Sequence, residues 1–352
     1  MPPVRKTSLT HSGFHQSDIR DIMQNYFLPN PQYIFDTRGR IRLKLLESLK
    51  HLVFDVFGPR FTPPITDQAL NDLIVGGRAF PNAVIFALHG VLLKAALSEN
   101  TTDVPKALEI LKDIANRSTG QPDQFSVQPL AGDLLHPDDV YLLKYAFADD
   151  LGLTTSLVAP ASEVTEQCKL LVTEALETLG QTAPDWMEEL QLLTNQIYFA
   201  VADTDAQQLF GGASVFDAFG AVLINPLGLK DLPRTLMSLV HESSHQQMFV
   251  YHLDDEIVLN DASASFTSPL RKQPRPMEGI FHAMWVSARM AVAAQAVLNS
   301  PNRPTWSEEL REHQTRAIRA FRDCEDTVAE HAKLTDLGSI LFSNSKGAVD
   351  AI

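Results

Sequence analysis

The chain has 352 residues, of which 45% are hydrophobic, enough to bury a large core. Its formal net charge of −14 disfavours nucleic acid or an anionic membrane as a main partner, since both attract positive protein surfaces. Cys168 and Cys324 are too few for a disulfide framework or a cysteine-based zinc site, and they fit a reducing compartment. No apolar run approaches the roughly 20 residues that span a bilayer, and the N-terminus lacks the apolar segment of a signal peptide. We therefore expect a cytoplasmic protein.

Apolar periodicity predicts that the first third of the chain is helical. The expected helices are at 17–27, at 41–56, just before Gly76-Gly77, at 82–97 and at 104–116. His51 and His89 fall within these helices, where a single histidine is most often a core or boundary residue. We assign these two histidines no chemistry.

Residues 118–137 are the best linker candidate, because the composition turns polar there and the periodicity disappears. We therefore expect a helical N-terminal region at 1–125 and a metal-binding catalytic domain at 126–352.

The second region combines further helices with short strands. Helices are expected at 138–148, 161–179, 277–298 and 307–333, and strands at 197–201, 221–225 and 257–259. The expected class is mainly α (α+β): a helix-rich protein whose small sheet precedes the metal-binding helix, with a core like that of zinc peptidases.

The sequence His241-Glu242-Ser243-Ser244-His245 is an HExxH motif inside an apolar-periodic run that predicts a helix. Residues four apart lie on one helix face, so His241 and His245 can offer two imidazoles to one metal ion. Glu242, one step round the helix, can reach the open side of that ion. These two histidines are therefore the predicted local metal ligands, and Glu242 is the predicted catalytic residue.

The motif needs a third protein ligand from elsewhere in the chain. Met248 and Tyr251 stand where the HExxHxxGxxH pattern requires glycine and histidine, which excludes the metzincin version. On a continued helix His252 would lie about 10 Å beyond His245, too far to share an ion. The remaining candidates are His282 and Glu278, one turn apart on the helix expected at 277–298.

The choice between these two candidates divides the functional hypotheses. Glu278 would complete the two histidines and one glutamate of a hydrolytic zinc enzyme, with Glu242 as general base. The preceding loop favours another chemistry, since Arg271 and Arg275 lie within a dozen residues of His282. An arginine beside a metal is well suited to hold the distal carboxylate of a small diacid. Arg289, on the same helix, is a third candidate for this role.

These residues resemble the α-ketoglutarate-dependent HExxH-type peptide β-hydroxylases, which modify ribosomally made peptides. The resemblance rests on the HExxH motif, the strand-like segment 221–225 before it, and the block from Ser268 to His282 with its Arg-Pro and Gly-x-x-His sequences. It covers residues 220–290 well and the helical N-terminal part only in general character.

The resemblance implies a peptidase-like scaffold that binds Fe(II) through His241, His245 and His282. It also implies α-ketoglutarate as cosubstrate, with Arg275, Arg271 or Arg289 as its anchor, and a precursor peptide as partner. The implied reaction couples oxidative decarboxylation of α-ketoglutarate to hydroxylation of a peptide Cβ. The alternative is a zinc-dependent HExxH metallopeptidase, and a third reading is a non-catalytic peptide-binding protein. The sequence does not indicate an oligomeric state.

Overall fold

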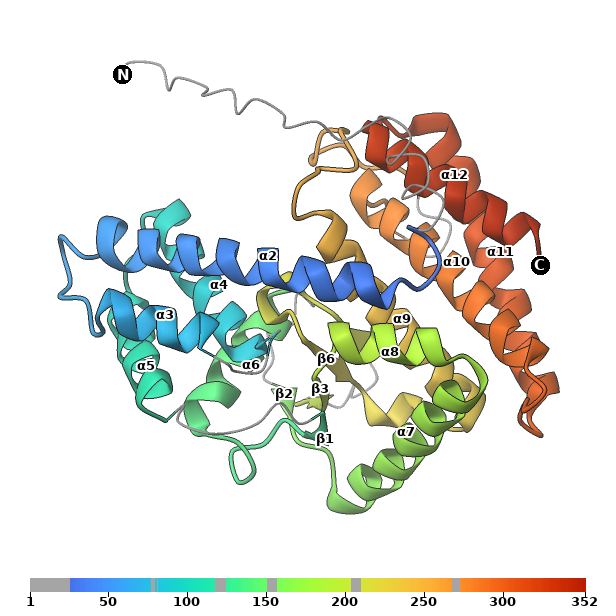
Figure 1. The fold of residues 1–352 in the computed structure, drawn as a ribbon, viewed down its shortest axis with the longest axis horizontal. Helices are drawn as coiled ribbons and strands as arrows, with labels where there is room; N and C mark the ends of the chain where they lie inside the picture. Colours follow the sequence, from blue (N-terminus) through green and yellow to red (C-terminus); the bar gives the residue numbers. More distant parts are fainter. Residues whose placement is uncertain are drawn as a thin grey trace.

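The computed structural model describes residues 26–76, 80, 82–117, 125–150, 157–203, 210–267 and 273–352. Helices make up most of this part of the chain, around a small central sheet (Figure 1). The predicted class, mainly α with a small sheet, is confirmed.

The N-terminal helices lie on one side of the molecule, and the long helix α2 (Pro31–Lys50) crosses from them towards the C-terminal helices (Figure 1). The side chain of Asn30 accepts the N–H of Tyr33 and caps α2, which therefore begins ten residues before the expected start at Ile41. A π-helical turn, His51–Val56, continues α2. The remaining helices of this part are α3 (Asp67–Val75), α4 (Ala83–Ser98) and α5 (Val104–Arg117). Of the helix expected at 17–27, residues 17–25 lie outside the described part and the last two residues form a bend.

The sheet has the strand order β1-β3-β6-β5. Its strands are β1 (Ser126–Pro129), β3 (Gln196–Phe199), β5 (Gly212–Ala213) and β6 (Ala221–Ile224). The first three strands in this order run parallel, and β5 pairs antiparallel with β6 at the edge. A separate antiparallel pair joins β2 (Leu157–Val158) to β4 (Val201–Ala202). Strand β1 falls within the segment predicted as a linker, so that part of the prediction is wrong.

The two central strands, β3 and β6, are buried on both faces, which explains their largely apolar sequences. Tyr198 and Leu223 belong to the core shared with the N-terminal helices, whereas Phe199 and Val222 belong to the core under the C-terminal half. This alternation follows from the two-residue period of a strand. The core that contains the N-terminal helices also contains sheet residues, so it crosses the boundary expected at 125/126 without a break.

The helices of the second half are α6 (Pro137–Asp150), α7 (Ser162–Thr182), α8 (Pro184–Leu193), α9 (Leu232–Tyr251), α10 (Met277–Asn299), α11 (Ser307–His331) and α12 (Asp336–Asp350) (Figure 1). Helices α7 to α11 contribute to the core on the other face of the sheet, whereas α6 packs on α4 and α12 packs on α10. Two sequence expectations need correction here. The strand expected at 257–259 is only an isolated bridge between Val258 and Leu334, and α12 is a further helix beyond the one expected to end the chain.

Helix α10 is the one helix among the described residues that is long and apolar enough to cross a membrane. The sequence reading expected no segment of this kind. However, 72% of its most apolar window is buried inside the protein, where α10 packs between α9 and α11. We therefore describe α10 as a core helix.

Candidate metal centre

Helix α9 carries the HExxH motif and is fixed at its start by local interactions. The carboxylate of Asp231 accepts the N–H of Arg234, and Pro233 occupies the first turn, where its missing N–H costs nothing. Leu236 and Val240 are buried between α9 and its neighbours, which fixes how α9 is turned about its axis. The motif is therefore presented by a rigid helix.

Four histidines form a row across the interface between α9 and α10. The ring centroids of His241 and His245 lie 5.0 Å apart, those of His245 and His282 5.7 Å, and those of His282 and His252 5.4 Å. The Nδ1 atoms of His245 and His282 are separated by 3.4 Å. Packing of α10 on α9 thus brings the distant His282 to the HExxH helix.

His241 stands at the far end of this row. Its Nδ1 lies 3.4 Å from Sδ of Met290 on α10, and its Nε2 lies 4.0 Å from Oε1 of Glu242. The predicted ligand set His241, His245 and His282 is not among the groups of the described residues whose donor atoms all lie within 4.8 Å of one another.

His252 lies at the opposite end, where it caps α9 with helical backbone and its N–H bonded to the carbonyl of Met248. Sequence reasoning set His252 aside because a continued helix places it too far from His245 to share an ion, and it did not expect this residue beside His282 and Glu278. Nε2 of His252 lies 3.3 Å from Nε2 of His282 and 2.8 Å from Oε1 of Glu278. No local sequence signal indicates this contact, because it depends on how α10 packs on α9.

Glu278 joins His252 to the neighbouring His282, since its Oε1 also lies 3.0 Å from Nε2 of His282. Partial burial opposes ionisation of this carboxyl, but its hydrogen bonds with His252 and His282 outweigh that effect and lower the pKa of Glu278 to about 2. The carboxylate is thus ionised, and it fixes the ring orientation of His282 through one nitrogen while the other nitrogen faces His245. This is the usual way in which a carboxylate orients a metal-binding histidine.

Glu242 is buried against the edge strand β5. Its Oε2 accepts a hydrogen bond of 2.8 Å from the hydroxyl of Ser214, and a Cβ on Gly212 would lie only 2.4 Å from its Oε1. Any other residue at position 212 would force this carboxylate to move. The edge of the sheet therefore determines where the predicted catalytic residue points.

A cleft of about 780 Å³ opens beside the histidine row, within the usual size range of ligand pockets. His252, Glu278 and His282 line it together with the aromatic rings of Phe216 and Phe249. The remaining lining residues are Asp254, Asp255, Glu256 and Val258. A ligand in this cleft would contact one end of the row.

The three arginines predicted to anchor α-ketoglutarate have different positions. Arg271 lies outside the described residues. Arg289 is only 1% exposed and forms a buried ion pair with Glu189, so its guanidinium is already engaged away from the cleft. Arg275 precedes α10 in a backbone bridge with Phe266, and its half-buried guanidinium lies against Gly279. Neither of the two described arginines lines the cleft, and we retain Arg275 because its guanidinium lies on the first turn of the helix that carries His282.

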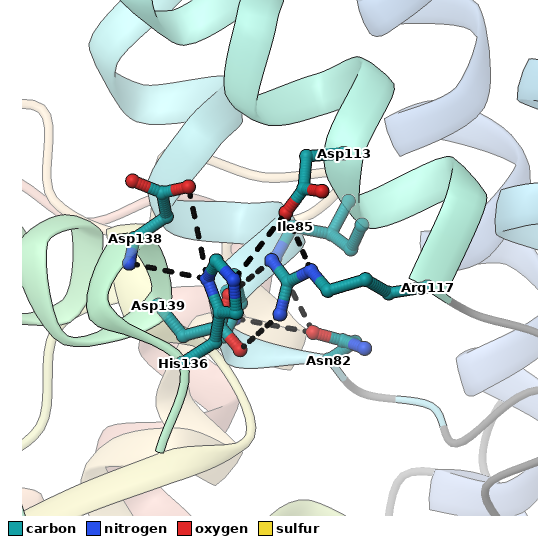
Figure 2. A network of polar contacts seen from close by, with 8 residues as sticks. Asn82, Ile85, Asp113, Arg117, His136, Asp138 and Asp139 are labelled. Atoms are coloured by element: carbon teal, nitrogen blue, oxygen red, sulfur yellow. Dashed lines mark hydrogen bonds and ion pairs between the residues drawn. The ribbon is translucent and has the colours of Figure 1, made fainter. Parts of the chain in front are cut away.

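Two groups of three potential ligands bring their donor atoms within 4.8 Å of one another in the described part of the chain. One is His252, Glu278 and His282, and the other is Asp113, His136 and Asp138 (Figure 2). In the second group Arg117 already pairs with Asp113 and with Asp139 (Figure 2). A cation there would compete with the guanidinium, so we interpret this group as an ion-pair network between α5 and α6.

Comparison of the chain with protein-family models finds no match, and a search of curated proteins finds no match either. The functional argument therefore depends on the residues of the centre itself.

Proposed function

We propose that the protein is an Fe(II)- and α-ketoglutarate-dependent oxygenase that β-hydroxylates residues of a ribosomally synthesised precursor peptide in the cytoplasm. The proposal follows from the resemblance of two segments to the HExxH-type peptide β-hydroxylases. These segments are the HExxH motif and the block that runs from Arg275-Pro276 to His282. The observation that carries the proposal is that α10 brings His282 to within 3.4 Å of His245 and is directly preceded by the segment that contains Arg275.

In this proposal His241, His245 and His282 hold the iron. Neutral imidazole suits Fe(II), and three protein ligands leave positions for a cosubstrate and O2. The bound iron would supply the oxidative decarboxylation of α-ketoglutarate that drives hydroxylation. Glu278 would keep His282 oriented by accepting a hydrogen bond from its Nε2–H, and His252 would hold the Glu278 carboxylate in place.

Arg275 would bind the distal carboxylate of α-ketoglutarate. Its backbone is restrained by the flanking residues Pro274 and Pro276 and by the two hydrogen bonds to Phe266. Gly279 lets the guanidinium lie directly on the first turn of α10. A planar guanidinium held in this way can bind a carboxylate through two parallel hydrogen bonds.

A different ligand set is also compatible with the same cleft. The donor atoms of His252, Glu278 and His282 are 2.8 to 3.3 Å apart, and neighbouring ligands with bonds of about 2.1 Å lie about 3 Å apart around one ion. Two histidines and one carboxylate are also the common ligand set of non-haem iron oxygenases. We prefer the HExxH set because hydrogen bonding alone accounts for the Glu278 contacts.

A zinc-dependent metallopeptidase is the second candidate function. It is favoured by one observation, the 4.0 Å distance between Oε1 of Glu242 and Nε2 of His241, which places a general base near an ion held by the motif. In the oxygenase Glu242 has no water to deprotonate and would orient the substrate or a ligand.

The two functions can be separated by anaerobic reconstitution. Protein loaded with Fe(II) and α-ketoglutarate should develop the visible charge-transfer band of an iron–oxo-acid complex, and O2 should then yield succinate. With the cognate precursor peptide, mass spectrometry should find a product heavier by one oxygen atom. Absence of the band, together with peptide cleavage by the zinc-loaded protein, would establish the peptidase instead. Protein that binds neither metal would favour a non-catalytic peptide-binding role.

A further inference from the structure

A buried ion pair lies behind the histidine row. Arg289 of α10 and Glu189 of α8 are 1% and 2% exposed, and Nη2 of the arginine contacts Oε1 of the glutamate. The guanidinium also stacks over the ring of Trp186, 4.4 Å from its centroid. Both charges are therefore fully removed from water.

This pair is tied directly to the HExxH helix. Nε of Arg289 donates to Oγ of Ser244 at 3.3 Å, and Nε2 of Gln247 donates to Oε2 of Glu189 at 3.2 Å. Ser244 immediately precedes His245, and Gln247 follows it by two residues. The two charges thus contact α9 on both sides of a predicted metal ligand.

The chain before α2 closes the same network. The carbonyl of Phe27 accepts Nη1 of Arg289 at 2.5 Å, and the N–H of Asn30 donates to Oε2 of Glu189 at 2.9 Å. One pair of side chains therefore connects α8, α9, α10 and the N-terminal segment, elements that are far apart in sequence.

A buried ion pair is a poor source of stability, because desolvation of the two charges offsets their attraction, and apolar replacements of similar volume are often neutral. Such a pair is better suited to specify one arrangement, since each partner is costly to leave unpaired. Here the arrangement that it specifies is the register of α10 on α9. Arg289 lies two helical turns after His282 and contacts the residue next to His245.

We infer that Glu189 and Arg289 are positioning residues of the metal centre: they lock the register of α9 and α10 so that His245 and His282 face one another. This inference rests on the proposed metal-binding function. The pair does not touch the ion or the substrate, and it acts through Ser244, Gln247 and the helix interface.

The first test is titration of the full-length protein with Co(II), followed by its visible absorption spectrum. Arg289→Met alone should lower the melting temperature, because it leaves the Glu189 carboxylate buried and unpaired. The double variant Glu189→Gln/Arg289→Met should recover most of that loss, yet bind Co(II) about 10 to 100-fold more weakly than wild type, as expected when groups that orient ligands are lost. A double variant with wild-type affinity and spectrum overturns the inference.

The control for this test is Glu312→Gln/Arg316→Met, which makes the same charge changes in an exposed pair on α11. It should change neither the melting temperature nor the affinity for Co(II). If wild-type protein binds no Co(II), the proposed function fails. If wild type binds it and the double variant binds it equally well, only the positioning role fails.

A milder pair of variants decides the question even if the double variant does not fold. Ser243 and Ser244 are adjacent and buried, and both donate a hydrogen bond to the carbonyl of Val240. Of these two serines, the one that accepts a described hydrogen bond from Arg289 is Ser244. Ser244→Ala should weaken Co(II) binding by about tenfold, while Ser243→Ala should leave it unchanged. Equal effects of the two substitutions would overturn the inference.

Discussion

Nδ1 of His245 lies 3.4 Å from Nδ1 of His282 across the interface between α9 and α10, although 37 residues separate them in the chain. The other nitrogen of His282 is held by Glu278. In the proposed centre, His282 is therefore the ligand and Glu278 the group that orients it.

Substitution of His282 should therefore affect the metal more than substitution of Glu278. We expect His282→Ala to lose bound Fe(II) as completely as His245→Ala, because each removes a donor atom. Glu278→Gln should lower the affinity by no more than about 10 to 100-fold and retain the metal at saturating concentration. Metal content after gel filtration and equilibrium titration measures both effects.

His252→Ala is a second test of the same assignment, since it removes only the residue that supports the Glu278 carboxylate. It should lower the metal affinity to the same extent as Glu278→Gln. Loss of the metal from both of these variants, with retention in His241→Ala, would instead assign the ion to His252, Glu278 and His282.

Arg275→Ala should weaken α-ketoglutarate binding by about 30-fold or more while the metal stays bound, because a charge-assisted bidentate contact in a partly dry pocket is lost. Arg275→Lys should recover only part of the affinity, since an ammonium cannot reproduce the two parallel hydrogen bonds. Titration of the iron-loaded protein with α-ketoglutarate under anaerobic conditions measures both. Normal affinity in Arg275→Ala would place the anchor elsewhere, with Arg271 the next residue to substitute.

Gly279→Ala tests whether the position of the Arg275 guanidinium matters. The new methyl group would lie 3.1 Å from Nη2 of Arg275, so the guanidinium must shift by a few tenths of an ångström. We expect α-ketoglutarate affinity to fall several-fold while metal affinity stays the same. Gly39→Ala, which meets nothing within 4 Å on α2, is the matched control and should leave both affinities unchanged. An unchanged α-ketoglutarate affinity in Gly279→Ala would contradict this expectation.

The stability of the fold should decrease as the pH falls below about 6.5, in part through His89. Burial lowers the pKa of this imidazole from 6.5, and nearby Asp217 opposes the effect only partly. Between the folded and the unfolded pKa the unfolded chain binds a proton that the folded chain does not, so the free energy of unfolding decreases as the pH is lowered through this window. His89→Gln should flatten the dependence by about 1.4 kcal/mol for each unit of pKa difference.

Urea unfolding at pH 7 and pH 5 measures the contribution of His89. Its Nε2 lies 2.8 Å from the hydroxyl of Ser48, a contact that glutamine can partly replace. Identical losses of stability in wild type and His89→Gln between the two pH values would show that other groups cause the dependence.

Local features of the sequence were enough to predict several parts of the structure. The HExxH helix, the strands near 197–201 and 221–225, and the helix at 277–298 were recognised because helix and strand periods depend only on neighbouring residues. The contact between His282 and His245 was also within reach, because the HExxH spacing creates a need for one more ligand.

Only the tertiary structure decided which other residues join the centre. His252 contacts Glu278 because α10 packs on α9. Arg289 is no longer a candidate anchor, because it forms a buried ion pair with Glu189 of α8. Strand β1 lies in a polar segment expected to be a linker. It forms because its backbone pairs in parallel with strand β3. These outcomes depend on the packing of distant segments, whereas periodicity and motif spacing report only what lies within a few residues along the chain.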